Sequence, residues 1–182
     1  CGPGMTTSAG AMQVVSGLLE LDVPLILDAD ALNCLAKIAI DGIDSNPEMY
    51  RREQPLVMTP HYRELSRLVA GDEVNDLGTA IAAAQKVVWA AGSDNLVVIA
   101  KGPTTAICGV ERVLLPLSGP ASLATAGSGD VLAGILAGTL ATMRDEMDRW
   151  ELLYSYAVAL HSYAGFAAAT EYGEKSVIAT DL

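Results

Sequence analysis

A single carboxylate stands inside a run of small residues in the second half of the chain. Residues 123–138 read LATAGSGDVLAGILAG, with Asp130 after two glycines and ahead of an apolar helical pattern. Gly127 and Gly129 allow a tight turn and the close approach of a ligand. The start of a helix presents free N–H groups and a partial positive charge, which bind phosphate. Asp130 could then act as a general base for a hydroxyl that attacks the terminal phosphate of a nucleotide.

Asp130 also has a purely structural interpretation. Aspartate is a favoured N-cap residue, and Gly134 and Gly138 would let the following helix pack closely against a neighbour. The chain contains no G-x-x-x-x-G-K-[ST] segment, so the turn is not a Walker loop. The turn by itself therefore leaves a working carboxylate and a helix cap both open.

Three apolar strand patterns elsewhere in the chain end in polar residues. They are PLILDADALN, PLVMTPH and NLVVIAKG. Strands that alternate with helices predict a parallel sheet with helices on both faces. Ligands bind beyond the carboxyl ends of such strands. We therefore expect seven polar residues to gather there: Asp28, Asp30, Asn33, Thr59, His61, Lys101 and Thr104.

The remaining patterns predict the elements that position these residues. Apolar spacing predicts helices over 6–21 (with Thr6, Thr7 or Ser8 as its cap), 32–40, 63–70, 76–92 (ended by Gly92) and 148–170. TTAIC and RVLLPL predict two further strands around Gly109, and the polar residues 41–54 predict a loop. His161, on the long apolar helix, is interpreted as a histidine whose hydrogen bonds are satisfied.

Composition limits the protein classes to which the chain can belong. It has 182 residues, of which 51% are hydrophobic, and 17 glycines, which suits one α/β domain with tight strand-to-helix turns. The formal net charge of −11 argues against nucleic acid as a partner. It does not exclude a nucleotide, because backbone N–H groups and a metal ion can hold phosphates locally.

The cysteines and the apolar segments bear on the compartment. Cys1, Cys34 and Cys108 form no C-x-x-C pair, so we interpret them as reduced thiols that act as small buried hydrophobes. No segment reaches the roughly 18 uninterrupted apolar residues of a membrane span, and no signal peptide is recognisable. These features predict a cytoplasmic protein without membrane contact.

Five short motifs follow one another along the chain. They are GPGM at 2–5, LDADALN at 27–33, TPHYRE at 59–64, KGPTT at 101–105 and AGSGDVLAG at 126–134. In this order they resemble the segments of the ADP- or ATP-dependent NAD(P)H-hydrate dehydratases, a branch of the ribokinase-like superfamily. The resemblance implies an α/β fold, a three-layer αβα sandwich with a mostly parallel central sheet.

The resemblance also implies a reaction and the residues that serve it. ADP or ATP, with Mg²⁺, would phosphorylate the hydroxyl of hydrated NADH or NADPH, and loss of phosphate would restore the dinucleotide. Asp130 would be catalytic and would contact the hydrate, and no residue is assigned as a metal ligand. The nucleotide-binding residues would be Lys101, Gly102, Pro103, Thr104, Thr105, Gly127, Ser128 and Gly129. The substrate-binding residues would be Gly2, Gly4, Asp28, Asn33, His61 and Asp130.

Several of these residues have structural interpretations of their own. Lys101 could be a solvated cation at a strand end, and His61 could be a loop histidine bonded to a backbone carbonyl. Asp28, Asp30 and Asn33 could be turn formers and a helix cap. We expect at least one of these three to bond the substrate or to position Mg²⁺.

The chain departs from the family pattern in two places. TPHYRE at 59–64 has Tyr and Arg where the family has Pro and Gly, which changes the turn after His61. Family members also carry a substantial part before the GPG motif, including the first strands of the sheet. We therefore expect residues 1–182 to form a single ribokinase-like domain that lacks its N-terminal portion and exposes an unpaired sheet edge.

Further expectations concern the cleft and the partners. His61 and Asp130 are expected to face one cleft, because both follow strand ends of one sheet. Apolar helix faces and the family resemblance predict a homo-oligomer, and an epimerase domain or partner is left open.

Two other functions stay open at this point. A ribokinase-like kinase for a hydroxymethylpyrimidine, a hydroxyethylthiazole or a sugar would also use the GSGD turn. A non-catalytic module that binds nucleotide or serves as an assembly scaffold is the third alternative. A kinase would release a stable phosphoester, whereas the dehydratase would release phosphate and NADH.

Overall fold

The computed structural model describes residues 1–39, 47–142 and 150–182. They fall into two compact units, each of which is described by itself. The first comprises Cys1–Gly102 and Ala106–Val113, and the second comprises Pro103–Thr105 and Leu114–Leu182. The expectation of a single domain stays a prediction.

A five-stranded sheet organises the first unit. Its strands are β1 (Leu25–Leu27), β2 (Leu56–Met58), β3 (Leu96–Ala100), β4 (Ala106–Cys108) and β5 (Val113–Leu114), in that spatial order. β1, β2 and β3 are parallel, and β4 runs antiparallel to β3. The predicted α/β class is confirmed, with a sheet that is parallel in its first strands and antiparallel later.

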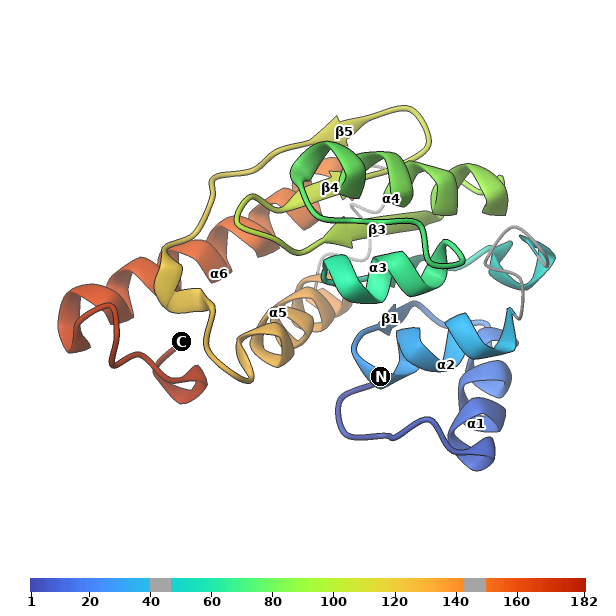
Figure 1. Cartoon of the computed structure of the whole chain (residues 1–182), viewed down its shortest axis with the longest axis horizontal. Helices are drawn as coiled ribbons and strands as arrows, with labels where there is room; N and C mark the ends of the chain where they lie inside the picture. Colours follow the sequence, from blue (N-terminus) through green and yellow to red (C-terminus); the bar gives the residue numbers. More distant parts are fainter. Residues whose placement is uncertain (40–46, 143–149) are drawn as a thin grey trace. The chain divides into compact units, whose positions relative to one another are not determined.

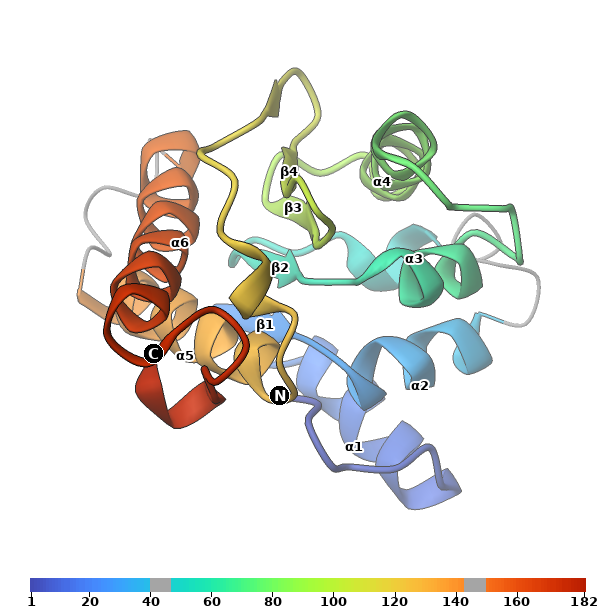
Figure 2. The same ribbon diagram turned by 60° about the vertical axis from the view of Figure 1, so that its left-hand side comes forward.

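Helices connect the parallel strands, as the alternating pattern predicts. The first unit contains α1 (Ala9–Leu19), α2 (Asp30–Ile38), the 3₁₀ helix η2 (Pro47–Tyr50), α3 (Tyr62–Leu68) and α4 (Leu77–Ala91). Figures 1 and 2 show α2, α3 and α4 side by side in chain order, and neighbouring helices of this row contact each other. The row therefore brings the start of α2 and the start of α3 to neighbouring strand ends.

The core of this unit explains why its strands read as continuous apolar runs. All five residues of β3 are buried, and so are the three of β2 and the three of β4. Leu27, Leu32 and Leu65 are among the fully buried side chains, and they join β1, α2 and α3 in one apolar cluster. Burial of this kind stabilises a side chain by roughly 1.5–3 kcal/mol.

Helix boundaries follow local capping. Ser8 is the N-cap of α1 and its Oγ accepts from the Ala11 N–H, and Gly92 ends α4 in the left-handed region, both as predicted. α2 begins at Asp30, earlier than predicted, because the carboxylate in its first turn complements the helix dipole. Residues 47–50 of the predicted 41–54 loop form the helix η2. Residues 41–46 of that predicted loop lie outside the described residues.

The first residue of the chain lies beside the edge strand β1. The Cys1 amino group donates to the Ile26 carbonyl at 2.8 Å, and the Asp28 N–H donates to the Cys1 carbonyl at 3.0 Å. All three thiols are free, and Cys34 and Cys108 are buried as predicted. Cys1 is exposed, so its interpretation as a buried hydrophobe is wrong; it lies beside the edge strand, outside the core of the unit.

The second unit is built from helices. It contains η3 (Ala121–Leu123), α5 (Ser128–Thr142), α6 (Trp150–Tyr172) and η5 (Ala179–Asp181). α6 contacts both α5 and η3. Across the three described ranges, no helix combines the length and apolarity needed to cross a membrane.

Two glycines of the first unit should respond in opposite ways to alanine. Gly92 has φ +56°, where a Cβ is strained, so Gly92→Ala should destabilise the protein by about 1 kcal/mol. Gly17 lies within α1, where a Cβ would meet nothing within 4 Å. Gly17→Ala should therefore stabilise by about 0.5–1 kcal/mol. Urea unfolding of both variants measures the difference, and equal changes would contradict these backbone assignments.

Candidate active site

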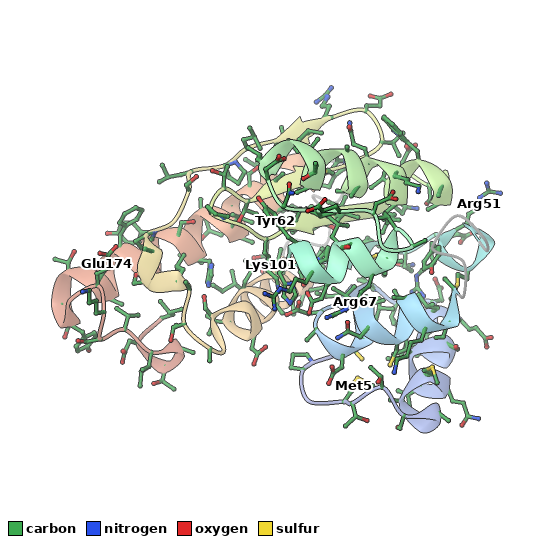
Figure 3. The ribbon with its side chains drawn as sticks, in the orientation of Figure 1. Met5, Arg51, Tyr62, Arg67, Lys101 and Glu174 are labelled. Carbon is green, nitrogen blue, oxygen red and sulfur yellow. The ribbon has the colours of Figure 1, made fainter. Side chains whose placement is uncertain are left out.

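Three side chains meet at the carboxyl ends of β1, β2 and β3. We call Asp28, His61 and Lys101 the strand-end cluster. Lys101 Nζ lies 2.6 Å from Asp28 Oδ1, and Asp28 is only 2% exposed. His61 and Lys101 pair in a parallel bridge, in which the Lys101 N–H donates to the Pro60 carbonyl at 2.8 Å. Lys101 is thus a partly buried ion-pair partner rather than a solvated cation (Figure 3).

His61 is held by the first turn of the helix that follows it. Its Nδ1 accepts from the Glu64 N–H at 3.3 Å, and its Nε2 lies 3.3 Å from Glu64 Oε1. The Glu64 carboxylate also accepts from the His61 N–H at 2.9 Å, which completes a capping box. The imidazole is half exposed and bonds an N–H group and a carboxylate here, not the backbone carbonyl of the structural interpretation. TPHYRE therefore starts α3 without the family's Pro and Gly.

The surroundings of His61 favour its neutral form. Partial burial lowers the pKa of His61, and the positive charges of Lys101 and Arg67 lower it further. The carboxylates of Glu64 and Asp28 oppose this shift. A neutral imidazole with an exposed face can donate or accept a hydrogen bond from a ligand.

A second set of polar contacts runs from the glycine turn to α3. Asp30 Oδ2 accepts from the Thr6 N–H at 2.8 Å, and Asp30 Oδ1 lies 3.4 Å from Asn33 Nδ2. Asn33 Oδ1 in turn accepts from Arg67 at 2.7 Å (Figure 3). The sequence analysis missed Arg67. Its spacing was the available signal, because 61, 64 and 67 are three residues apart and lie on one face of the helix.

The backbone between the two aspartates is strained. Ala29 has φ +49° and ψ −120°, an unusual conformation for a residue with a Cβ, which costs roughly 1–3 kcal/mol. This turn lets Asp28 bond Lys101 while Asp30 bonds the Thr6 N–H and Asn33. Strain of this kind clusters at functional sites.

The GPGM turn lies directly on this strained segment. Gly2 has φ +138°, and a Cβ there would stand 1.7 Å from the Asp28 carbonyl oxygen, so only glycine fits. Gly4 has φ +71° but open space around it. Thr59, by contrast, is fully buried, and its Oγ1 donates to the Leu27 carbonyl at 3.4 Å, so its hydroxyl is occupied inside the sheet.

The glycine turn of the second unit leads into α5. Gly127 has φ +86°, and its carbonyl accepts from the Asp130 and Val131 N–H groups at 3.0 and 3.2 Å. Asp130 is the third residue of α5, inside the helix, so the N-cap interpretation is wrong. Its exposed carboxylate has no hydrogen-bond or ion-pair partner among the described residues of its unit. A Cβ at Gly134 or Gly138 would meet nothing within 4 Å, so close packing does not explain these glycines.

The predicted nucleotide segment is divided between the two units. Lys101 and Gly102 belong to the first, and Pro103, Thr104 and Thr105 belong to the second, where Ser118 Oγ donates to Thr104 Oγ1 at 3.2 Å. A common cleft for His61 and Asp130 accordingly stays a prediction.

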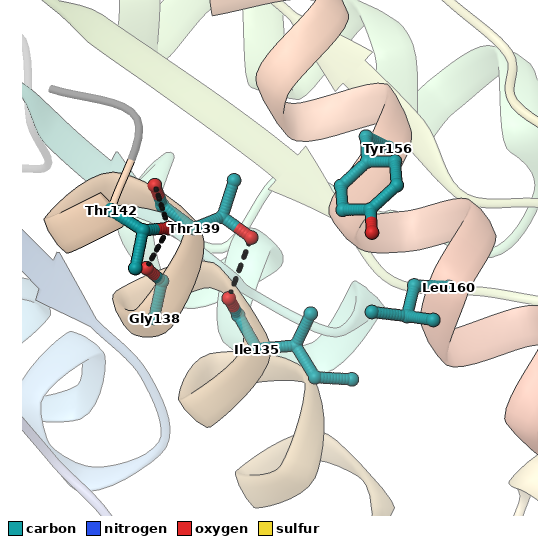
Figure 4. A pocket seen from close by; sticks show the side chains of 6 residues that line it. All are labelled: Ile135, Gly138, Thr139, Thr142, Tyr156 and Leu160. Carbon is teal, nitrogen blue, oxygen red and sulfur yellow. Dashed lines mark hydrogen bonds between the residues drawn. The ribbon is translucent and has the colours of Figure 1, made fainter. Parts of the chain in front are cut away.

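A hollow of about 490 Å³ lies between α5 and α6 (Figure 4). It is lined by Ile135, Gly138, Thr139, Thr142, Tyr156 and Leu160. The Thr139 and Thr142 hydroxyls donate to carbonyls of their own helix, so they are not free donors toward a ligand. None of the predicted site residues lines this hollow, and its lining carries no positively charged side chain for phosphate.

Comparison with known proteins adds independent findings. The sequence model of the Carb_kinase family, described as NAD(P)H-hydrate dehydratase, matches residues 1–182. The chain is 38% identical over 189 residues to the bifunctional NAD(P)H-hydrate repair enzyme Nnr of Salinibacter ruber, covering all of this chain and 31% of that protein. It is 35% identical over 143 residues to the ADP-dependent (S)-NAD(P)H-hydrate dehydratase of Neisseria meningitidis serogroup B, covering 77% of this chain and 46% of that protein.

Solved structures agree with these relatives. The ADP/ATP-dependent NAD(P)H-hydrate dehydratase from Bacillus subtilis, co-crystallised with ATP and Mg²⁺ and soaked with CoA, superposes with a TM-score of 0.77 at 30% identity. The match covers 98% of this chain and 60% of that one. Phosphofructokinase-2 from Escherichia coli shares the fold alone, with a TM-score of 0.59 at 22% identity, covering 94% of this chain and 49% of that one. The ribokinase-like fold is confirmed, and the chain spans about a third of the bifunctional relative in the previous paragraph.

Removing only one partner of the buried ion pair should lower the unfolding free energy more than removing both partners. Lys101→Met would leave the Asp28 carboxylate buried without its counter-charge, which costs roughly 3–5 kcal/mol. The double variant Lys101→Met with Asp28→Asn removes both charges and should recover much of that loss. Urea unfolding of the single and double variants measures it. A single variant that is no less stable than the double would contradict a buried ion pair.

The lowered pKa of His61 should make stability depend on pH. A histidine with a depressed pKa in the folded state contributes stability that is complete above its ordinary pKa of 6.5 and is lost as the pH falls below it. His61→Asn keeps a good N-cap and does not titrate. Between about pH 7.5 and about pH 5.5 the unmodified protein should therefore lose more unfolding free energy than the variant. Equal losses of unfolding free energy in the two proteins would show that His61 does not cause this pH dependence.

Proposed function

Because the chain belongs to the NAD(P)H-hydrate dehydratase family, we propose that it repairs hydrated NADH or NADPH with the help of ADP or ATP. The reaction would transfer a phosphoryl group to the hydrate's hydroxyl and then expel phosphate. The family model matches the whole chain, whereas the relatives are longer than the chain.

The observation that carries the proposal is the turn that opens α5. It combines a glycine in the left-handed region, the start of a fifteen-residue helix and a carboxylate without a partner in its own unit. An anion is favoured at such a helix start. The carboxylate also complements the helix dipole in this first turn, but a bound anion beside it would repel it, because like charges repel. A proton-accepting role accounts for its presence.

Asp130 would act as the general base of the phosphoryl transfer. Its carboxylate would take the proton of the hydrate's hydroxyl as the hydroxyl oxygen forms its bond to phosphorus. ADP or ATP supplies the phosphoryl group that turns a poor leaving group, hydroxide, into a good one. The carbon–oxygen bond of the resulting ester then breaks, phosphate leaves with the bonding electrons, and loss of a ring proton restores the dihydronicotinamide.

The groups that bind the nucleotide would come from two backbone segments. Lys101 would supply positive charge, and the glycine-containing turn at 127–129 would supply N–H groups. A Cβ at Gly102 would stand 2.4 Å from the Tyr62 hydroxyl, so the backbone approaches α3 closely there. The described residues contain no cluster of three or more histidine, cysteine or carboxylate ligands. Mg²⁺ bound with the nucleotide would need no such cluster, because this ion is commonly held by one or two carboxylates together with phosphate oxygens.

The hydrate would bind against the strand-end cluster and the glycine turn. Gly2 and Gly4 would bring backbone close to the substrate, and His61 would offer its exposed imidazole. Asn33 would present its amide in the orientation set by Asp30 and Arg67. Asp28 would act mainly through Lys101, because it is almost fully buried.

The remaining predictions concern partners and location. We propose a homo-oligomer in the cytoplasm, and an epimerase domain or partner stays open. The kinase alternative gains no support from the kinases of the same fold, whose identity of 22% or less carries the fold alone.

Asp130→Asn tests the catalytic assignment. Asparagine keeps the size of the side chain but accepts no proton at neutral pH, so turnover of hydrated NADH should fall by roughly 10²- to 10⁴-fold. ATP affinity should stay nearly unchanged, or tighten slightly because a negative charge is removed. Single-turnover absorbance of restored NADH, with ATP titration calorimetry, measures both.

Glu174→Gln is the matched control, since it removes an exposed carboxylate of the same unit (Figure 3). It should leave turnover unchanged. Near-normal turnover in Asp130→Asn would return Asp130 to a structural role.

A further inference from the structure

One turn of α6 holds the segment that leads into the glycine turn. Ser162 Oγ donates to the Leu117 carbonyl at 3.1 Å, and Ser122 Oγ donates to the Gly165 carbonyl at 3.4 Å. A Cβ at Gly165 would stand 2.7 Å from the Leu123 side chain, so the helix and the segment are in close contact. We call His161, Ser162 and Gly165 the α6 seat.

His161 ties this seat to the first residue of α5. Its Nε2 lies 3.0 Å from the Ser128 carbonyl oxygen and 3.1 Å from Ser128 Oγ. Both residues are buried, with exposures of 8% and 4%. A carbonyl oxygen only accepts, so this geometry requires the hydrogen on Nε2. The imidazole thus donates to Ser128 from a fixed tautomer.

The position of Ser128 gives this contact a role beyond packing. Ser128 stands between Gly127, whose carbonyl accepts from the Asp130 N–H, and Gly129. Gly127, with φ +86°, is conformationally permissive, so the turn needs an outside contact to hold one geometry. His161 supplies that contact from 33 residues away in sequence.

We propose that His161 is a positioning residue of the nucleotide site, which holds the turn at 127–130 ready for phosphate by donating from Nε2 to Ser128. The identity of the ligand as a nucleotide rests on the proposed function. The geometry of the turn rests on the contacts of the α6 seat. His161 itself touches neither nucleotide nor substrate. A histidine that merely fills the core would tolerate an apolar replacement without an effect confined to this turn.

Three substitutions at one position separate these roles. His161→Gln carries an amide that reaches the place of Nε2 and donates there. His161→Asn is polar but shorter, and His161→Leu is apolar. Thr170→Val is the control on the same helix, since its hydroxyl donates to the Phe166 carbonyl of its own helix.

Hydrogen exchange measures the turn without reference to activity. Peptides spanning residues 125–132 should exchange roughly 10-fold faster in His161→Leu and His161→Asn, because a buried acceptor loses its donor. His161→Gln and Thr170→Val should exchange like the unmodified protein, and α4 should be unaffected in all four. Unchanged exchange at 125–132 in His161→Asn, or an equal effect in His161→Gln, would overturn the proposal. If His161→Leu fails to fold, the exchange of residues 125–132 in His161→Asn still tests the proposal.

Titration with ATP and Mg²⁺ connects the turn to its ligand. The affinity should fall by about 10-fold in His161→Asn and be restored in His161→Gln, because the binding turn is less populated. Faster exchange with unchanged ATP affinity would overturn the positioning role. If the unmodified protein binds neither ATP nor ADP, the proposed function fails, whereas the exchange experiment still decides whether His161 holds the turn.

Discussion

The ion pair between Asp28 and Lys101 is the contact on which the arrangement of the first unit depends. It joins the ends of β1 and β3 across β2, and its partners are 73 residues apart in the chain. Burying two charges is costly unless their geometry is good. The 2.6 Å contact is accompanied by the strained turn at Ala29 and by a glycine packed against the Asp28 carbonyl. The pair therefore constrains both motifs at the start of the chain.

The second unit solves a similar problem without an ion pair. Its glycine turn has little rigidity of its own, and a buried imidazole from a distant helix holds it. In both units, a backbone turn near strand or helix ends is held by a side chain that approaches from elsewhere in the sequence. Groups arranged before the substrate arrives lose little free energy to reorganisation, which is the usual basis of electrostatic catalysis.

The sequence predicted the elements whose signals are local. Apolar runs located β1, β2 and β3, and Ser8 and Gly92 marked helix ends through their own chemistry. Polar residues at strand ends pointed to the right edge of the sheet, because parallel strands share that edge. The family motifs identified the same segments independently of the hydrophobic pattern.

The missed features depend on partners far away in the chain. Ala29 adopts a positive φ that cannot be predicted from an alanine in the sequence, since tertiary contacts impose it. The role of Arg67 depends on its contact with Asn33, and the role of His161 depends on its contact with Ser128. Asp130 was open between cap and base because the turn pattern does not specify the register of the helix start. The interpretation of Gly134 and Gly138 as close-packing sites was also wrong, because packing depends on neighbouring atoms that the local sequence does not specify.

The product of the reaction tests the central claim most directly. Hydrated NADH and ATP would be incubated with the protein, and phosphate and restored NADH would be measured in the same sample. The two should appear in equal amounts, because each phosphorylated hydrate loses its phosphate as the ring is restored. Accumulation of a stable phosphoester, or ATP binding without any NADH, would contradict it.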